Sequence, residues 1–375
     1  MSTPVRVAMV VGKMVGGGVE SIVMSYIKHI DREKVHFTLL ADSDSTCVPE
    51  NEIIGNGAEL IYIPPYSRQI IYQKTLYDIF REKQFDVVHS HINTLSVFPL
   101  FAAKRAGVPV RIAHSHSTSG KGERLKNTVK YMLRPFATVF PTKLCSCGEY
   151  AGRWLFGKNA VFDILPNNLD FESDRFAFDP SASEAFRNLY GIDKCLAVGH
   201  VGRFIPQKNH FFLIDIFAEI RKLRPDAFLF LAGQGRLEDA VRDKVRSLGI
   251  EDSVIFLGQI SDIESFYSAM DVLLLPSLYE GKPLTAMEAQ YASLPVVMSD
   301  RITGEAVLIP ELVRKLPLEA SSREWARQTV LAAGADRKRV DTAALKGNST
   351  VSADELSDWY VGLCEEKREK DTVAV

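Results

Sequence analysis

Apolar runs and helix-compatible stretches alternate along this chain, in two successive series. Such alternation favours a parallel β-sheet wrapped by helices. The first series has apolar runs at Val5–Val11, Phe37–Leu40, Leu60–Ile63, Val87–Val88, Val110–Ala113, Leu144–Cys147 and Val161–Leu165. The second has them at Cys195–Val201, Phe228–Leu231, Val254–Leu257, Val272–Leu275 and Val296–Met298. We therefore predict an α/β protein with two such sheets.

A stretch rich in Asp, Ser and Phe, Phe171–Ser183, separates the two series and is interpreted as a linker. It divides the chain into domains at residues 1–180 and 181–350. The 375 residues are enough for two ordinary globular cores. The segment 353–367 predicts a further, amphipathic helix, because its apolar residues recur at helical spacing: Leu356, Trp359, Tyr360 and Leu363.

Charge and cysteine usage exclude several classes of protein. The formal net charge of −2 gives no global basic field, which argues against a nucleic-acid binder. The five cysteines are scattered, and Cys145 and Cys147 have the wrong spacing for a zinc hairpin, so we expect reduced thiols. No signal-type segment precedes Val5, and no stretch approaches the roughly 18 apolar residues of a membrane span. We expect a cytoplasmic protein.

The most informative loop follows the apolar run Val272–Leu275, and a helix-compatible stretch begins near Pro283. Proline suits a first helical turn, so the backbone amides around Lys282, Leu284 and Thr285 predict an anion site for a phosphate. Glu280 and Glu288 flank that site and could accept hydrogen bonds from sugar hydroxyls. A nucleotide sugar would satisfy all these groups; the alternative is a βα loop with two solvated glutamates.

Two further loops also follow predicted strands. Arg203 and Lys208 come directly after the first strand of the second series and are placed to meet one anion, unless they are an ordinary solvated pair. The glycines Gly16, Gly17 and Gly18 lie between a strand and a helix, where they would let a ligand approach the backbone or merely form a tight turn. They lack the G-x-G-x-x-G spacing of a nicotinamide-binding domain.

Four histidines, at His89, His91, His114 and His116, raise the hypothesis of a metal site. Their His-x-His spacing puts alternate residues on one strand face but supplies no carboxylate partner, and zinc sites need three or four ligands in a fixed frame. We therefore expect no metal. His89 lies within an apolar strand and is expected in the core, whereas the others could line a cleft.

The stretch from Glu280 to Glu288 resembles the Glu-x7-Glu motif of the retaining glycosyltransferases of family 4. The resemblance implies the GT-B fold, with two facing Rossmann-like domains, a cleft between them and a last helix that returns to the first domain. It also implies that Glu280 lies by the donor sugar and that Glu288 holds the ribose. The backbone that binds the diphosphate would be Gly281, Lys282, Pro283 and Leu284, with Lys282 at a position where relatives often have an apolar residue.

Other motifs resemble the same family in the expected order. Arg203 and Lys208 match its Gly-Arg-x4-Lys pattern, which implies that they stabilise the departing diphosphate. His114 matches the histidine near the donor sugar. The resemblance also assigns the glycine loop to the donor phosphates and a group of residues to the loops around the base: Gly233, Gly235 and Gln259.

From this resemblance we expect a retaining, metal-independent glycosyltransferase without a cofactor. It would move a sugar from a nucleotide-sugar donor, a UDP-sugar, to a glycan or lipid-linked saccharide in exopolysaccharide or cell-surface glycan synthesis. The alternatives are a catalytically inactive nucleotide-sugar-binding regulator on the same fold, and a nicotinamide oxidoreductase, whose fingerprint is absent.

The stretch 121–134 predicts an amphipathic basic helix, with Leu125, Val129 and Met132 at helical spacing. One interpretation is an ordinary surface helix with its apolar side in the core. The family resemblance favours peripheral contact with an anionic membrane surface instead. That contact would be made by Lys121, Arg124, Lys126, Lys130 and Arg134.

Overall fold

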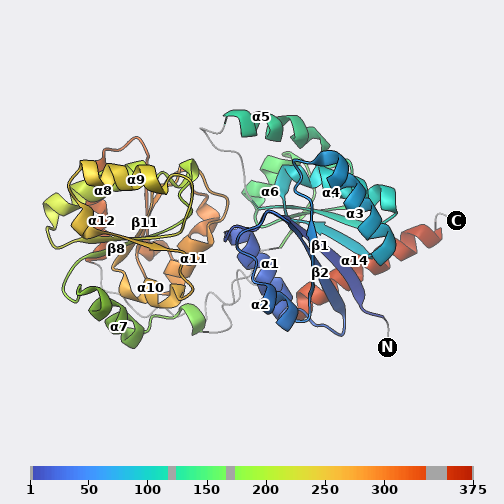
Figure 1. Cartoon of the computed structure of the whole chain (residues 1–375), viewed down its shortest axis with the longest axis horizontal. Helices are drawn as coiled ribbons and strands as arrows, with labels where there is room; N and C mark the ends of the chain where they lie inside the picture. The colour runs from blue at the N-terminus through green and yellow to red at the C-terminus, as the bar shows by residue number, and fades with distance from the viewer. Residues whose placement is uncertain (1–2, 117–123, 166–173, 335–352, 374–375) are drawn as a thin grey trace. The chain divides into compact units, whose positions relative to one another are not determined.

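The computed structural model describes residues 3–116, 124–165, 174–334 and 353–373 (Figure 1). They form two compact units. The first contains the described residues up to 165 together with 353–373, and the second contains residues 174–334. Short 3₁₀ turns connect several of the longer elements, at Asn93–Ser96 (η1), Arg134–Phe136 (η2), Asp174–Phe176 (η3), Pro206–Lys208 (η4), Glu251–Ser253 (η5), Gly304–Ala306 (η6) and Pro310–Leu312 (η7).

The first unit is built on a parallel sheet in the order β3-β2-β1-β4-β5-β6-β7. Its strands are β1 (Val5–Gly12), β2 (Val35–Asp42), β3 (Glu59–Ile63), β4 (Val87–Ser90), β5 (Val110–Ser115), β6 (Lys143–Ser146) and β7 (Asp163–Ile164). Its helices are α1 (Gly18–His29), α2 (Glu50–Gly55), α3 (Gln69–Lys83), α4 (Val97–Ala106), α5 (Arg124–Leu133), α6 (Glu149–Phe156) and α14 (Ala353–Val373). The central strands β1 and β4 are almost entirely buried, as expected for a sheet covered on both faces.

Helix α14 packs on the first unit although it comes from the far end of the chain. Its Leu356 and Tyr360 are buried. Trp359 donates from Nε1 to Asp163 Oδ2 at 2.8 Å, and the backbone amide of Asp31 donates to Ser357 Oγ at 3.1 Å. The amphipathic pattern in the sequence therefore corresponds to a docked helix.

The second unit has a parallel sheet in the order β10-β9-β8-β11-β12-β13. Its strands are β8 (Ala197–Val201), β9 (Phe228–Ala232), β10 (Val254–Gly258), β11 (Val272–Leu275), β12 (Val296–Ser299) and β13 (Val313–Leu316). Its helices are α7 (Pro180–Tyr190), α8 (His210–Leu223), α9 (Glu238–Ser247), α10 (Ile263–Ala269), α11 (Leu284–Tyr291) and α12 (Ser322–Ala333). Together the two sheets give the doubly wound α/β architecture that the sequence predicts.

The expected linker lies partly outside the described residues, which omit 166–173. Its later part belongs to the second unit. The Asp179 side chain accepts hydrogen bonds from the amides of Ser181 and Ala182 and so caps α7, while the Asp179 amide donates to Ser268 Oγ at 3.1 Å. The division between the units therefore comes before Asp174, whereas the sequence places the domain boundary at residue 180.

The loops after β8 and β9 pack so closely that glycine is required. The Gly202 amide donates to Ala232 O, and the Phe204 amide donates to Gln234 O. Gly233 has a φ of +133°, and a Cβ placed there would lie 2.3 Å from Gly202 O. Backbone contact therefore accounts for this glycine before any ligand is considered.

We predict that Gly233→Ala destabilises the protein far more than Gly249→Ala. Gly249 also has a positive φ, of +64°, but a Cβ there would meet no atom within 4 Å. The control should cost roughly 1–2 kcal/mol for the left-handed backbone alone. Gly233→Ala should cost more than about 3 kcal/mol, because the neighbouring backbone must also move. Urea unfolding measures both values, and equal losses would contradict the packing argument.

Candidate functional site

The site in the second unit forms where the loops after β8 and β11 meet. These two strands are parallel neighbours, so their carboxyl ends lie side by side. The Leu278 amide donates to Gln207 O at 2.8 Å, and Asn209 Nδ2 donates to Pro276 O at 3.0 Å. The two loops are thereby held together before their charged side chains are considered.

A nearly buried ion pair joins the same loops. Lys208 Nζ lies 2.7 Å from Glu280 Oε1, and the two side chains are only 14% and 9% exposed. Gln207 Nε2 donates to the other carboxylate oxygen, Glu280 Oε2, at 2.9 Å. Without a ligand, Lys208 therefore has Glu280 as its partner, which the sequence does not predict. Arg203 is exposed.

Glu288, one turn into α11, accepts a hydrogen bond from the Tyr267 hydroxyl at 2.6 Å. Burial raises the pKa of Glu288 to about 7, while the hydrogen bond from Tyr267 and the nearby positive charges of Arg175 and Lys208 oppose the shift. Lys208 therefore influences both glutamates of the motif.

The start of α11 has the properties of an anion site. Pro283 is the N-cap residue of α11, whereas the sequence predicts it in the first helical turn, one position later. No side chain caps the helix. The Thr285 hydroxyl is buried without a hydrogen-bond partner among the described residues. A buried orphan hydroxyl beside uncapped amides fits a phosphate that both would bind.

The remaining residues predicted to bind the donor occupy different surroundings. Gly281, Pro283 and Leu284 are buried, and Lys282 is half-buried. Gln259 follows β10 and is exposed. Gly235, like Gly233, is explained by packing, because a Cβ there would lie 2.7 Å from Phe204 O.

In the first unit, the glycine loop already holds an internal anion. The carboxylate of Glu20 accepts a hydrogen bond from the Val15 amide at 3.0 Å and another from the Gly17 amide. Gly16 has a φ of +76°, Gly17 is the N-cap residue of α1, and Gly18 begins that helix. The Gly17 amide, in the loop that the resemblance assigns to the donor phosphates, is thus satisfied by Glu20.

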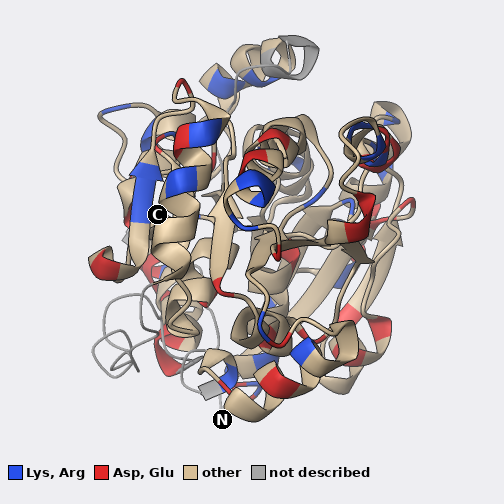
Figure 2. Ribbon diagram, turned by 90° about the vertical axis from the view of Figure 1, so that its left-hand side faces the viewer, with Lys and Arg blue, Asp and Glu red and all other residues tan. Residues whose placement is uncertain are grey.

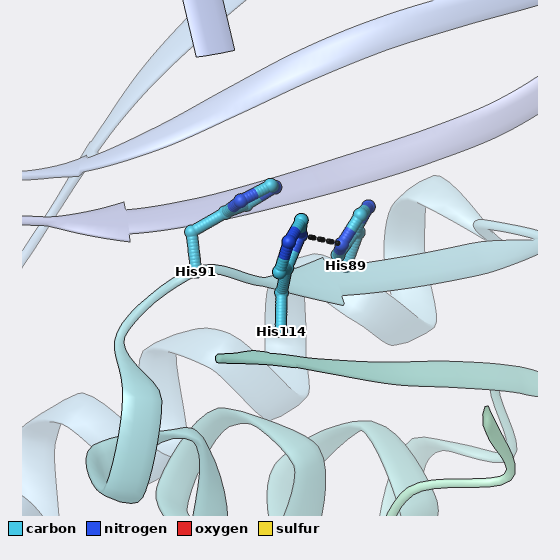
Figure 3. Close-up of side chains that lie close together, drawn as sticks. All are labelled: His89, His91 and His114. Carbon is cyan, nitrogen blue, oxygen red and sulfur yellow. Dashed lines mark hydrogen bonds between the residues drawn. The ribbon is translucent and has the colours of Figure 1, made fainter. Parts of the chain in front are cut away.

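The four histidines gather at the carboxyl ends of β4 and β5, and all are buried. His89 Nε2 and His114 Nδ1 are 3.1 Å apart, while His91 Nδ1 and His116 Nε2 are 2.9 Å apart. Burial lowers the pKa of every one of them, that of His116 to about 3, so the rings are neutral at physiological pH. Figure 3 shows His89, His91 and His114 close together, with the hydrogen bond between His89 and His114.

Three of these histidines could hold a metal ion by position. The ligand atoms of His89, His91 and His114 all lie within 4.8 Å of one another. The His-x-His spacing in the sequence does not predict that histidines of two different pairs come together as three possible ligands. His89 and His114 already hydrogen-bond each other, and His89 Nδ1 is 2.7 Å from the Tyr360 hydroxyl. These hydrogen bonds account for the arrangement without an ion, and the absence of a metal stays a prediction.

Comparison with known proteins identifies relatives along both units. Residues 16–151 match the family described as Glycosyltransferase Family 4, and residues 184–339 match Glycosyl transferases group 1. EpsF of Bacillus subtilis, which is named as a glycosyltransferase, is 35% identical over 349 residues and is matched over 90% of both chains. An Escherichia coli UDP-Gal:alpha-D-GlcNAc-diphosphoundecaprenol alpha-1,3-galactosyltransferase is 25% identical, over 78% of each chain.

A solved structure has the same fold. HepE of Anabaena, crystallised with UDP-glucose, has a TM-score of 0.73 at 17% identity, covering 98% of this chain and 99% of its own. The prediction of the GT-B fold is confirmed. The identity to EpsF over nine-tenths of both chains, with both units matched by family, shows that this chain belongs to the family 4 glycosyltransferases.

Proposed function

We propose that this glycosyltransferase retains the anomeric configuration of its sugar and uses a UDP-sugar donor. The acceptor is a glycan or lipid-linked saccharide, in exopolysaccharide or cell-surface glycan synthesis. The observation that carries the proposal is the Lys208–Glu280 ion pair beside the uncapped start of α11. The names of two relatives support the donor, a galactosyltransferase for UDP-Gal and HepE with UDP-glucose.

In this proposal the donor diphosphate binds the start of α11 and replaces Glu280 as the ion-pair partner of Lys208. The freed Glu280 carboxylate then accepts hydrogen bonds from the donor sugar, and Glu288 accepts one from the ribose. Lys208 and Arg203 stabilise the negative charge that develops on the departing diphosphate. Since Lys208 exchanges one anion for another, it remains paired throughout.

The transfer step needs no protein nucleophile. The bond from the anomeric carbon to the phosphate oxygen breaks, and its electron pair goes to the diphosphate. The acceptor oxygen bonds to the same face of that carbon, and its proton passes to the leaving phosphate oxygen. The inactive-regulator alternative is not favoured, because the ion pair, Glu288 and His114 are all present.

Turnover of UDP-sugars should depend on Lys208 and Arg203. With a panel of nucleotide sugars and hydrolysis followed by mass spectrometry, we expect Lys208→Ala and Arg203→Ala each to lower turnover by about one to two decades. That range corresponds to roughly 1.5–3 kcal/mol for a lost charge-assisted hydrogen bond to phosphate. The control is Lys222→Ala, whose side chain is 69% exposed, and it should leave turnover unchanged.

Unfolding temperatures of the variants separate lost chemistry from lost structure, because Lys208→Ala also leaves Glu280 without its partner. Undiminished turnover in both Lys208→Ala and Arg203→Ala would reject the phosphate assignment. Absence of turnover by the wild type on every donor of the panel would reject the proposed function itself.

We also propose that catalysis needs no divalent metal, since a cationic pair and helix amides can neutralise the diphosphate. Wild-type turnover should stay within about twofold of its starting rate after treatment with EDTA. Loss of even about 1.4 kcal/mol of transition-state stabilisation would lower the rate roughly tenfold, so a catalytic metal would be detected. Added Mg²⁺ or Mn²⁺ should not raise it. Abolition by the chelator with recovery on adding either metal would contradict this prediction.

The basic helix α5 supports a proposal of peripheral membrane contact. Val129 is 50% exposed and Met132 is 68% exposed, so these members of its apolar side are not in the core. Figure 2 shows blue basic bands on this helix at the top of the view. Lys130 is half-buried, and the Arg134 guanidinium lies 5.6 Å from the Trp154 ring centroid. Lys121 and the side chains of Arg124, Leu125 and Lys126 lie outside the described residues.

The proposal commits to an anionic membrane surface, which suits exposed apolar residues beside basic ones. None of the described helices is long and apolar enough to cross a membrane, so attachment would be reversible. Each basic residue near an anionic surface contributes about 1 kcal/mol.

Vesicle co-sedimentation tests the proposal. The protein should pellet with anionic but not neutral liposomes and should be released by high salt. Changing Lys126, Lys130 and Arg134 to Glu should abolish pelleting. The control makes the same charge change in the second unit, at Lys222, Arg246 and Arg301, and should preserve it. Wild-type protein that ignores anionic vesicles at low salt would favour a soluble acceptor.

A further inference from the structure

A chain of buried hydrogen bonds leads from α14 to His114. The Tyr360 hydroxyl lies 2.7 Å from His89 Nδ1, and His89 Nε2 lies 3.1 Å from His114 Nδ1. All three side chains are fully buried. At the far end, His114 Nε2 has no hydrogen-bond partner among the described residues.

The number of protons in this chain is fixed by burial. Burial raises the pKa of Tyr360 well above its ordinary value, so the hydroxyl keeps its proton. Burial lowers the pKa of His89 and His114 far below theirs, so each ring carries one proton. The only freedom left is the direction in which the hydrogen bonds run.

One direction satisfies the chain better than the other. If Tyr360 donates to His89 Nδ1, then His89 donates from Nε2 to His114 Nδ1, and the proton of His114 is on Nε2. In the reverse direction two groups lack a partner among the described residues: the Tyr360 hydroxyl proton has no second acceptor, and His114 Nε2 becomes an acceptor without a donor. The first direction leaves only the His114 N–H without a partner in the free protein. Each buried polar group without a partner is unfavourable, so the first direction, which leaves fewer of them, is preferred.

We propose that Tyr360 is a positioning residue that, through His89, holds His114 as the tautomer protonated on Nε2. His114 then presents a neutral N–H donor to an oxygen of the bound saccharide. This substrate contact rests on the proposed function, whereas the tautomer does not. The saccharide oxygen would supply the partner that His114 Nε2 lacks in the free protein.

Long-range ¹H–¹⁵N correlation spectra of protein with labelled histidine report the tautomer directly. In EDTA-treated, ligand-free wild type we expect His114 protonated on Nε2. Tyr360→Phe removes the hydroxyl that orders the chain, so the His114 signals should move toward the other tautomer. Donor turnover should fall by about tenfold, as expected for misdirecting one hydrogen bond.

Trp359→Phe is the matched control on the same helix. It removes the hydrogen bond from Trp359 to Asp163 but leaves the chain intact, so it should change neither the His114 tautomer nor turnover. If Tyr360→Phe fails to fold, His89→Phe breaks the same chain and should weaken turnover similarly.

His114 protonated on Nδ1 in the wild type, or unchanged by Tyr360→Phe, would overturn the inference while leaving the proposed function standing. Unchanged turnover in Tyr360→Phe despite a changed tautomer would likewise overturn the role in positioning. Absence of any wild-type turnover would reject the proposed function and the saccharide contact, with the tautomer decided separately by the spectra.

Discussion

The buried ion pair between Lys208 and Glu280 is the interaction on which the second unit's site depends. Each charge has lost most of its water, so each relies on the other; removing one partner of such a pair costs about 3–5 kcal/mol. Gln207 holds the same carboxylate and also donates to Tyr279 O, which ties the loop that leads into α11. Because α11 begins where that loop ends, the loop also sets the position of Glu288.

Much of the fold could be predicted because buried parallel strands are rich in apolar residues. Strands such as β11 and β12 stand out in the sequence as uninterrupted apolar runs. β13 was missed because it lies at the edge of its sheet, and its central residues, Arg314 and Lys315, are exposed and charged. Periodicity also located α14, but only the structure shows which surface it covers.

For the candidate site, motif spacing predicted which residues carry charge but not how they pair. Glu280, Glu288 and Lys208 were identified, yet their partners Gln207 and Tyr267 belong to no motif and become neighbours only through folding. Glu20, which binds amides of the glycine loop, lies in the first turn of an ordinary helix. Its place three residues after the N-cap Gly17 was the one signal in the sequence that could have predicted this contact.

The docking of α14 also determines the order in which the two units can finish folding during translation. Its Tyr360 packs edge-on against Phe37 of β2 with ring centroids 5.6 Å apart, and the helix contacts β1, β2 and β5. Those strands leave the ribosome before any of the second unit, yet the helix that covers them emerges after all of it. Until then the part of their surface that α14 covers is exposed to water. The half of the enzyme made first is therefore the half completed last.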